Sequence, residues 1–143
     1  MRVVIDTNIL VSAIMSPAGA ARQVLRLCLD GSVTPLLSNT LLLEYEDVCS
    51  RDALFVGAKI DAPVRGELFD AMIAACQWVP IYYLWRPNLR DEGDNHLMEL
   101  AVGGSASSIV TFNKRDFDGS ALAFPQIAIQ TASEFVHERS SRR

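Results

Sequence analysis

The stretch Val3-Val4-Ile5-Asp6-Thr7-Asn8-Ile9-Leu10 decides the fold of this chain. Its apolar, β-branched start is typical of a short strand that is buried on both faces, as strands are inside parallel sheets. Asp6 follows this strand directly, so we expect it at the carboxyl end of a central strand, where open α/β sheets bind ligands. Burying a carboxylate alone is costly, so Asp6 needs a cation, a hydrogen-bond donor or water beside it.

The composition is that of a single globular domain. The chain has 143 residues, of which 50% are apolar and 21% charged, and this length is sufficient to bury a full core. We expect one domain over residues 1–136 and a frayed tail over 137–143. No apolar run approaches a membrane span and no secretory signal opens the chain, so we expect a cytoplasmic protein without a membrane partner.

Charge and cysteine content narrow the function classes. A net charge of −4 argues against a protein that coats nucleic acid, but it is compatible with a nuclease whose acidic site attracts metal first. The three cysteines are widely spaced within apolar helical patterns, which favours buried free thiols over disulfides or a metal site; they are Cys28, Cys49 and Cys76.

Strand-like and helix-like segments alternate along the chain, which predicts an α/β fold with a mostly parallel sheet of about five strands. After the first strand, further strands are expected at residues 33–37, 79–84, 108–111 and 127–130. Helices are expected at residues 7–15, 20–29, 41–50, 53–60 and 63–77, then from residues 91–94 through Ala101, and from a capping box at residues 131–134. Thr7 or Asn8 is expected to cap the first helix.

Acidic residues follow the ends of successive strands. Glu44 lies early in the helix after the second strand, Asp94 in the first turn of the helix after the third, and Asp116 just after the fourth. Because the carboxyl ends of parallel strands meet at one edge, we expect these acids to lie near Asp6. Acids also cap helices and solvate loops, but caps need not all fall at one sheet edge.

Clustered carboxylates repel one another unless a positive charge shares their site. Mg²⁺ suits such a site, because it is held by a few carboxylates and waters while it engages substrate phosphates. The matching chemistry is in-line hydrolysis of a phosphodiester, with one or two metal ions that lower the pKa of the attacking water and offset the developing charge.

Three other residues near these acids carry polar side chains of interest. Lys114 and Arg115 follow the fourth strand, and we expect them to contact substrate phosphates. His96 is expected to be exposed or to cap its helix, because no second histidine lies at metal-ligand spacing.

Four short motifs in this order resemble the PIN domain. The motifs are residues 4–12 (VIDTNILVS), 41–45 (LLLEY), 91–101 (DEGDNHLMELA) and 109–117 (IVTFNKRDF). The resemblance extends from Met1 to about Val136, and within the family the chain looks like the toxins of bacterial type II toxin–antitoxin systems (VapC-like).

The resemblance implies a three-layer α/β/α fold and a ribonuclease that uses Mg²⁺ or Mn²⁺ to hydrolyse RNA. Such proteins are often homodimers that a small protein antitoxin inhibits. Asp6, Glu44 and Asp94 match the three acids of the family's metal site. Thr7 and Asn8 match residues that support it, and Thr111 is expected to act likewise.

The chain departs from the family at one position. Many members have aspartate where this chain has Asn113, which leaves Asp116 as the ionisable residue of that segment. We therefore expect Asp116 to be the fourth acid of the metal site and to assist a second ion or position the nucleophile, and Asn113 to orient water or a ligand.

Three other classes of protein begin with a comparable strand. A haloacid-dehalogenase phosphatase needs a second acid two positions after the first, where this chain has Asn8. A response-regulator receiver needs an acid pair after the first strand, which this chain also lacks. A PIN-like module that binds RNA or protein without cleavage stays as the alternative, although the intact trio of Asp6, Glu44 and Asp94 argues against it.

Overall fold

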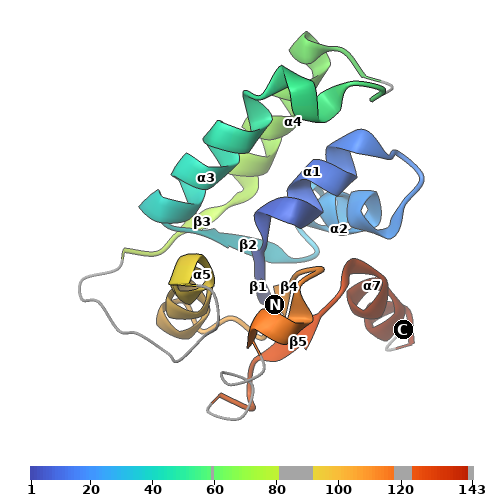
Figure 1. The fold of residues 1–143 in the computed structure, drawn as a ribbon. Helices are drawn as coiled ribbons and strands as arrows, with labels where there is room; N and C mark the ends of the chain where they lie inside the picture. The colour runs from blue at the N-terminus through green and yellow to red at the C-terminus, as the bar shows by residue number, and fades with distance from the viewer. Residues whose placement is uncertain (59, 81–91, 118–123, 142–143) are drawn as a thin grey trace.

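The strands form one parallel sheet with the order β3-β2-β1-β4-β5 (Figure 1). The computed structural model describes residues 1–58, 60–80, 92–117 and 124–141, and within these it leaves out the side chains of 92–95 and 141. The strands are β1 (Arg2–Ile5), β2 (Thr34–Leu37), β3 (Gln77–Trp78), β4 (Ser108–Val110) and β5 (Ala128–Gln130). The predicted parallel sheet of about five strands is confirmed.

Helices cover both faces of this sheet and complete a three-layer α/β/α fold. The α-helices are α1 (Thr7–Met15), α2 (Ala20–Leu29), α3 (Asn39–Cys49), α4 (Ala62–Ala75), α5 (Glu92–Gly103) and α7 (Ala132–Ser141). Two short 3-10 helices are η1 (Asp52–Phe55) and η2 (Lys114–Phe117). Figure 1 shows α5 on one side of the sheet and α1 with α2 on the other. No described helix is both long and apolar enough to span a membrane.

Strand β1 lies in the middle of the sheet, as its apolar sequence predicts. Val3 and Val4 have no exposed surface and Ile5 is 2% exposed. The strand pairs with β2 on one side and with β4 on the other, where Ile5 is in register with Val110. A residue placed directly after β1 is therefore delivered to the centre of the sheet edge.

Three predicted elements differ from the structure. The third strand is Gln77–Trp78, whereas we expected it at 79–84; Val79 and Pro80 are not in a strand, and 81–84 lie outside the described residues. The expected helix at 53–60 is only the 3-10 turn η1, because Gly57 adopts a positive φ of 87° that is incompatible with a continuing helix.

The last helix is longer than expected. α7 runs to Ser141 and so covers most of the segment 137–143 for which we expected frayed chain, while residues 142 and 143 lie outside the described part. Two side-chain contacts hold this part of the helix: the Gln130 amide donates to the Glu138 carboxylate, and Arg139 Nη1 lies 3.5 Å from Met1 Sδ.

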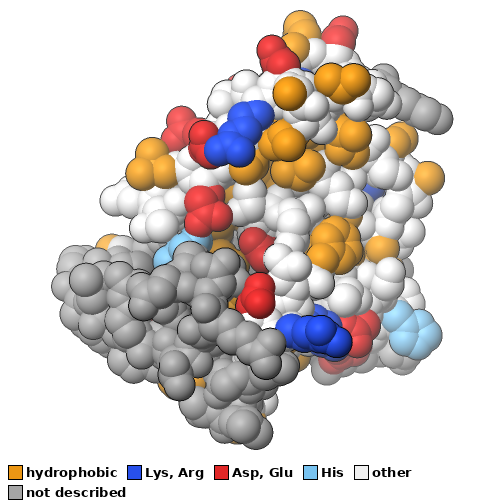
Figure 2. All heavy atoms as spheres, viewed as in Figure 1, with side chains coloured by type: hydrophobic (Ala, Val, Ile, Leu, Met, Phe, Trp, Pro, Cys, Tyr) orange, Lys and Arg blue, Asp and Glu red, His pale blue; other side chains and the backbone are white. Residues whose placement is uncertain are grey.

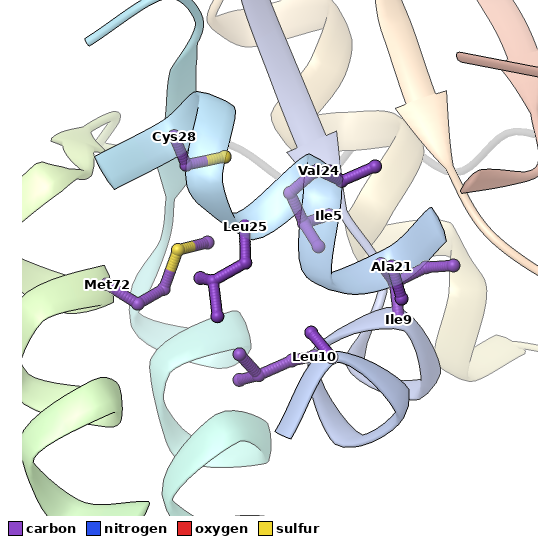
Figure 3. A pocket seen from close by; sticks show the side chains of 9 residues that line it. Ile5, Ile9, Leu10, Ala21, Val24, Leu25, Cys28 and Met72 are labelled. Atoms are coloured by element: carbon purple, nitrogen blue, oxygen red, sulfur yellow. The ribbon is translucent and has the colours of Figure 1, made fainter. Parts of the chain in front are cut away.

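The cysteines are free thiols, as their spacing predicts. All three are unpaired; Cys28 is buried, whereas Cys49 and Cys76 are only half-buried. Figure 3 shows Cys28 and Met72 beside Leu25 at a small cavity between α1, α2 and α4. The cavity of about 10 Å³ is apolar and has room for roughly one water-sized sphere. Burial raises the pKa of the Cys28 thiol to about 12, so this thiol is unreactive.

Candidate active site

Asp6 links strand β1 to helix α1. Its backbone N–H donates to Val110 O at 3.0 Å and so extends the pairing with β4. Its backbone is extended, and its carboxylate Oδ1 accepts from Thr7 N at 2.7 Å, which makes Asp6 the N-cap of α1. The expectation that Thr7 or Asn8 caps this helix is wrong, because the helix begins directly after the strand and the last extended residue is Asp6.

Thr111 holds the second oxygen of the Asp6 carboxylate. Its hydroxyl donates to Asp6 Oδ2 at 2.7 Å and accepts from Asn113 N at 3.0 Å. Thr111 has no exposed surface and Asp6 is 6% exposed, so both groups of this bond are withdrawn from bulk water. The Asp6 carboxylate is therefore fixed from both sides, by α1 and by the residue after β4.

Helix α3 brings Glu44 to the same edge. The hydroxyl of Thr7, the residue after Asp6, donates to Glu44 Oε1 at 2.9 Å. On the same helix, the hydroxyl of the fully buried Tyr45 donates to Ile5 O. These two bonds from neighbouring residues of α3 reach the residues on either side of Asp6, so the predicted approach of Glu44 to Asp6 is observed.

His96 joins the group from α5. Its Nε2 forms an ion-pair contact with Glu44 Oε2, and its side chain is 14% exposed. The expectation that His96 is exposed or caps its helix is therefore wrong. The sequence did contain a signal: the buried Glu99 and Leu100 lie three and four residues further along α5, on the same face as His96.

Asp6 and Glu44 differ in their electrostatics. Burial raises the pKa of Asp6 above its ordinary value of 3.8, although the hydrogen bonds from Thr111 and Thr7 oppose that shift. Burial also acts to raise the pKa of Glu44, but the contacts with His96 and Thr7 outweigh it and lower that pKa. The ionised Asp6 carboxylate is thus incompletely compensated by the protein groups around it.

The two other predicted acids, Asp94 and Asp116, have no described contact with Asp6 or Glu44. Asp94 lies in the first turn of α5, two residues before His96, and its side chain is outside the described part of the structure. Asp116 lies half-buried in η2, and the described side-chain interactions of Asp6 and Glu44 do not include it. Figure 2 shows acidic side chains close together near the middle of this face, with a histidine beside them.

Most of the sequence matches a known protein family. It matches the family model of the PIN domain over residues 2–115. The chain belongs to the PIN domain family. The matched range contains Asp6, Glu44 and Asp94 and ends one residue before Asp116. No curated protein matches the sequence significantly.

This PIN domain is also similar to a solved structure. The crystal structure of VapBC2 from Rickettsia felis bound to a DNA fragment from their promoter contains a chain that aligns with a TM-score of 0.55 and 16% identity. The alignment covers 92% of this chain and 98% of that one, so the fold is shared over nearly the full length of both.

The site of the PIN domain fits a divalent cation in its donor chemistry. Carboxylate oxygens are the donors that Mg²⁺ and Mn²⁺ prefer, and a Mg²⁺ site needs only one or two of them besides water. Asp6 and Glu44 supply such oxygens, and burial raises the pKa of Asp6, so a cation beside this carboxylate would favour its ionised form. Among the described side chains, which exclude Asp94, no group of three potential ligands is close enough to hold a metal.

Four polar residues of this PIN domain lie around the acids. Asn8 Oδ1 accepts from Phe112 N at 3.4 Å, which connects α1 to the segment after β4. Asn113 and Arg115 are exposed. Lys114 Nζ lies 2.9 and 3.1 Å from the two carboxylate oxygens of Glu134, so its charge is shared with α7.

Proposed function

We propose that this PIN domain is an endoribonuclease that uses Mg²⁺ or Mn²⁺ to hydrolyse RNA phosphodiester bonds. The observation that carries the proposal is the buried, incompletely compensated carboxylate of Asp6, joined through Thr7 to Glu44 at the carboxyl edge of a parallel sheet. A structural carboxylate has no need of a second acid beside it, whereas a metal site does.

Each residue of the site has a role in this proposal. Asp6, Glu44 and Asp94 would hold the catalytic metal, and Asp116 would assist a second ion or position the nucleophile. When bound, the metal lowers the pKa of a water molecule and offsets charge on the phosphate. Thr7 and Thr111 keep the carboxylates of Glu44 and Asp6 in place by donating hydrogen bonds to them. Asn8 and Asn113 would support this edge.

Lys114 and Arg115 would contact the phosphates of the RNA. The bond between Lys114 and Glu134 is a surface ion pair with both side chains nearly half exposed, and such pairs contribute only about 0–1 kcal/mol. A phosphate can therefore replace Glu134 as the partner of Lys114 at little cost. If Arg115→Glu left the affinity for RNA unchanged, the assignment of this segment to phosphate binding would be wrong.

We further propose that the protein is the toxin of a type II toxin–antitoxin pair. The four motifs resemble that group of PIN domains, and the structurally similar VapBC2 of Rickettsia felis supports a partner of the antitoxin kind. A homodimer, a cytoplasmic location and a single domain that extends through α7 belong to the same proposal.

The test is RNA cleavage by the purified protein with Mg²⁺, with Mn²⁺ and with EDTA. Asp6→Asn should abolish metal-dependent cutting, and Asp94→Ala should do the same. Asp47→Asn is the matched control, because Asp47 lies on the same helix as Glu44 but is exposed and pairs with Arg51. Full cutting by Asp6→Asn would refute the metal site. RNA binding without cutting under any metal would instead support the non-cleaving module.

A further inference from the structure

We propose that His96 is a positioning residue that holds the Glu44 carboxylate in the orientation required for metal binding. The proposal rests on the metal-dependent nuclease activity proposed above. It assigns a role to a side chain that is not itself placed among the metal ligands.

The two oxygens of the Glu44 carboxylate contact side chains from two different helices. Thr7 Oγ1 donates to Oε1 at 2.9 Å, and His96 Nε2 contacts Oε2. The Glu44 side chain is 41% exposed, so packing alone does not restrict it. A glutamate with three free torsions samples many rotamers, and the two contacts together select one of them.

His96 is suited to this role because its own position is fixed. Its side chain is 14% exposed, and the next two residues of α5, Leu97 and Met98, are buried in the core. α5 packs across β1, β2 and β4 and also contacts α3. The imidazole therefore reaches Glu44 from a helix that is packed against the sheet and against α3.

The contact does not require a particular charge on the imidazole. A neutral ring with its proton on Nε2 and a doubly protonated ring can both donate to a carboxylate. Within the described part of the chain Nδ1 has no hydrogen-bond partner, and the polar contact of Nε2 is its ion-pair contact with Glu44. Groups that orient metal ligands in this way typically change metal affinity by about 10- to 100-fold when they are removed.

The test measures binding of Mn²⁺ alone by isothermal titration calorimetry, without RNA. His96→Leu should weaken Mn²⁺ binding by about tenfold or more, as expected for loss of a group that orients a ligand. His96→Gln, whose amide can donate to Glu44, should recover most of the affinity. His137→Leu is the matched control, because His137 is exposed on α7 and should leave Mn²⁺ binding unchanged.

A double-mutant comparison separates positioning from a general effect on the fold. In a Glu44→Gln background, His96→Leu should cause little further loss, because the ligand that it positions has already been changed. If His96→Leu does not fold, His96→Asn provides the same test with a polar side chain that is too short to reach Glu44. If His96→Asn bound Mn²⁺ as tightly as the unmodified protein does, the proposal would be contradicted.

The outcomes distinguish this proposal from the function on which it rests. Mn²⁺ binding that is lost in Asp6→Asn but unchanged or tightened in His96→Leu would overturn the role of His96 and leave the metal site intact. Tightened binding would mean that His96 competes with the metal for Glu44. Absence of Mn²⁺ binding by the unmodified protein would refute both proposals.

Discussion

Replacing Thr111 with valine tests how the buried carboxylate of Asp6 is stabilised. The substitution keeps the branched shape of the side chain and replaces the hydroxyl with a methyl group. It removes the 2.7 Å bond to Asp6 Oδ2 and the 3.0 Å bond that the Thr111 hydroxyl accepts from Asn113 N. Because Thr111 has no exposed surface, water cannot readily replace either bond.

The expected loss of stability at neutral pH follows from these two bonds. A hydrogen bond to a charged group contributes roughly 1.5–3 kcal/mol and a neutral one about 0.5–1.5 kcal/mol. The free energy of unfolding should therefore fall by about 2–4 kcal/mol in Thr111→Val, and the melting temperature by something of the order of 10 °C.

The loss of stability in Thr111→Val should depend on pH. The pKa of Asp6 is already raised by burial above 3.8, and the Thr111 bond opposes that rise, so valine should raise the pKa further. A raised native-state pKa means that the native state binds the proton more tightly than the unfolded state does. Stability is then lost as the pH rises from the unfolded value through the native one. The difference between Thr111→Val and the unmodified protein should be smallest near pH 4 and grow toward pH 7.

The assay is urea denaturation in EDTA between pH 4 and pH 8, so that no metal contributes. Thr34→Val is the control, because Thr34 is a half-buried strand residue whose hydroxyl makes no hydrogen bond to a carboxylate among the described contacts. A loss in Thr111→Val that is the same at every pH would refute the argument, since it would mean that the Asp6 charge is not what the hydroxyl stabilises.

Three further substitutions test one buried hydrogen bond and the packing of two glycines. Tyr45→Phe removes the bond to Ile5 O and should lower the free energy of unfolding by about 1–3 kcal/mol, measured by urea denaturation; no change would show that this bond does not anchor α3. Gly104→Ala places a methyl group against Leu36 and should destabilise by about 1–3 kcal/mol, whereas the helical Gly66→Ala meets open space and should stabilise by about 0.5–1 kcal/mol. Equal melting temperatures for the two alanine variants would contradict the packing argument.

Local sequence signals predicted several elements closely. The helices expected at 7–15 and 20–29 are α1 (Thr7–Met15) and α2 (Ala20–Leu29). Ser38 caps α3 by accepting from Leu41 N, and Thr131 and Glu134 form the expected capping box with bonds of 2.9 and 3.2 Å. These features depend on residues within four positions of one another, so the sequence contains nearly all of the information that decides them.

The sequence alone determined that a buried strand ends in Asp6 and that further acids follow later strands. Parallel topology predicts that these acids lie at one sheet edge, and the described side chains show this for Glu44, which contacts Thr7, the residue after Asp6. The tertiary structure decided which atoms meet. Glu44 and His96 are 52 positions apart and belong to different helices, so helical periodicity indicates a buried face for His96 but cannot name its partner. That choice follows from how α3 and α5 pack on the sheet.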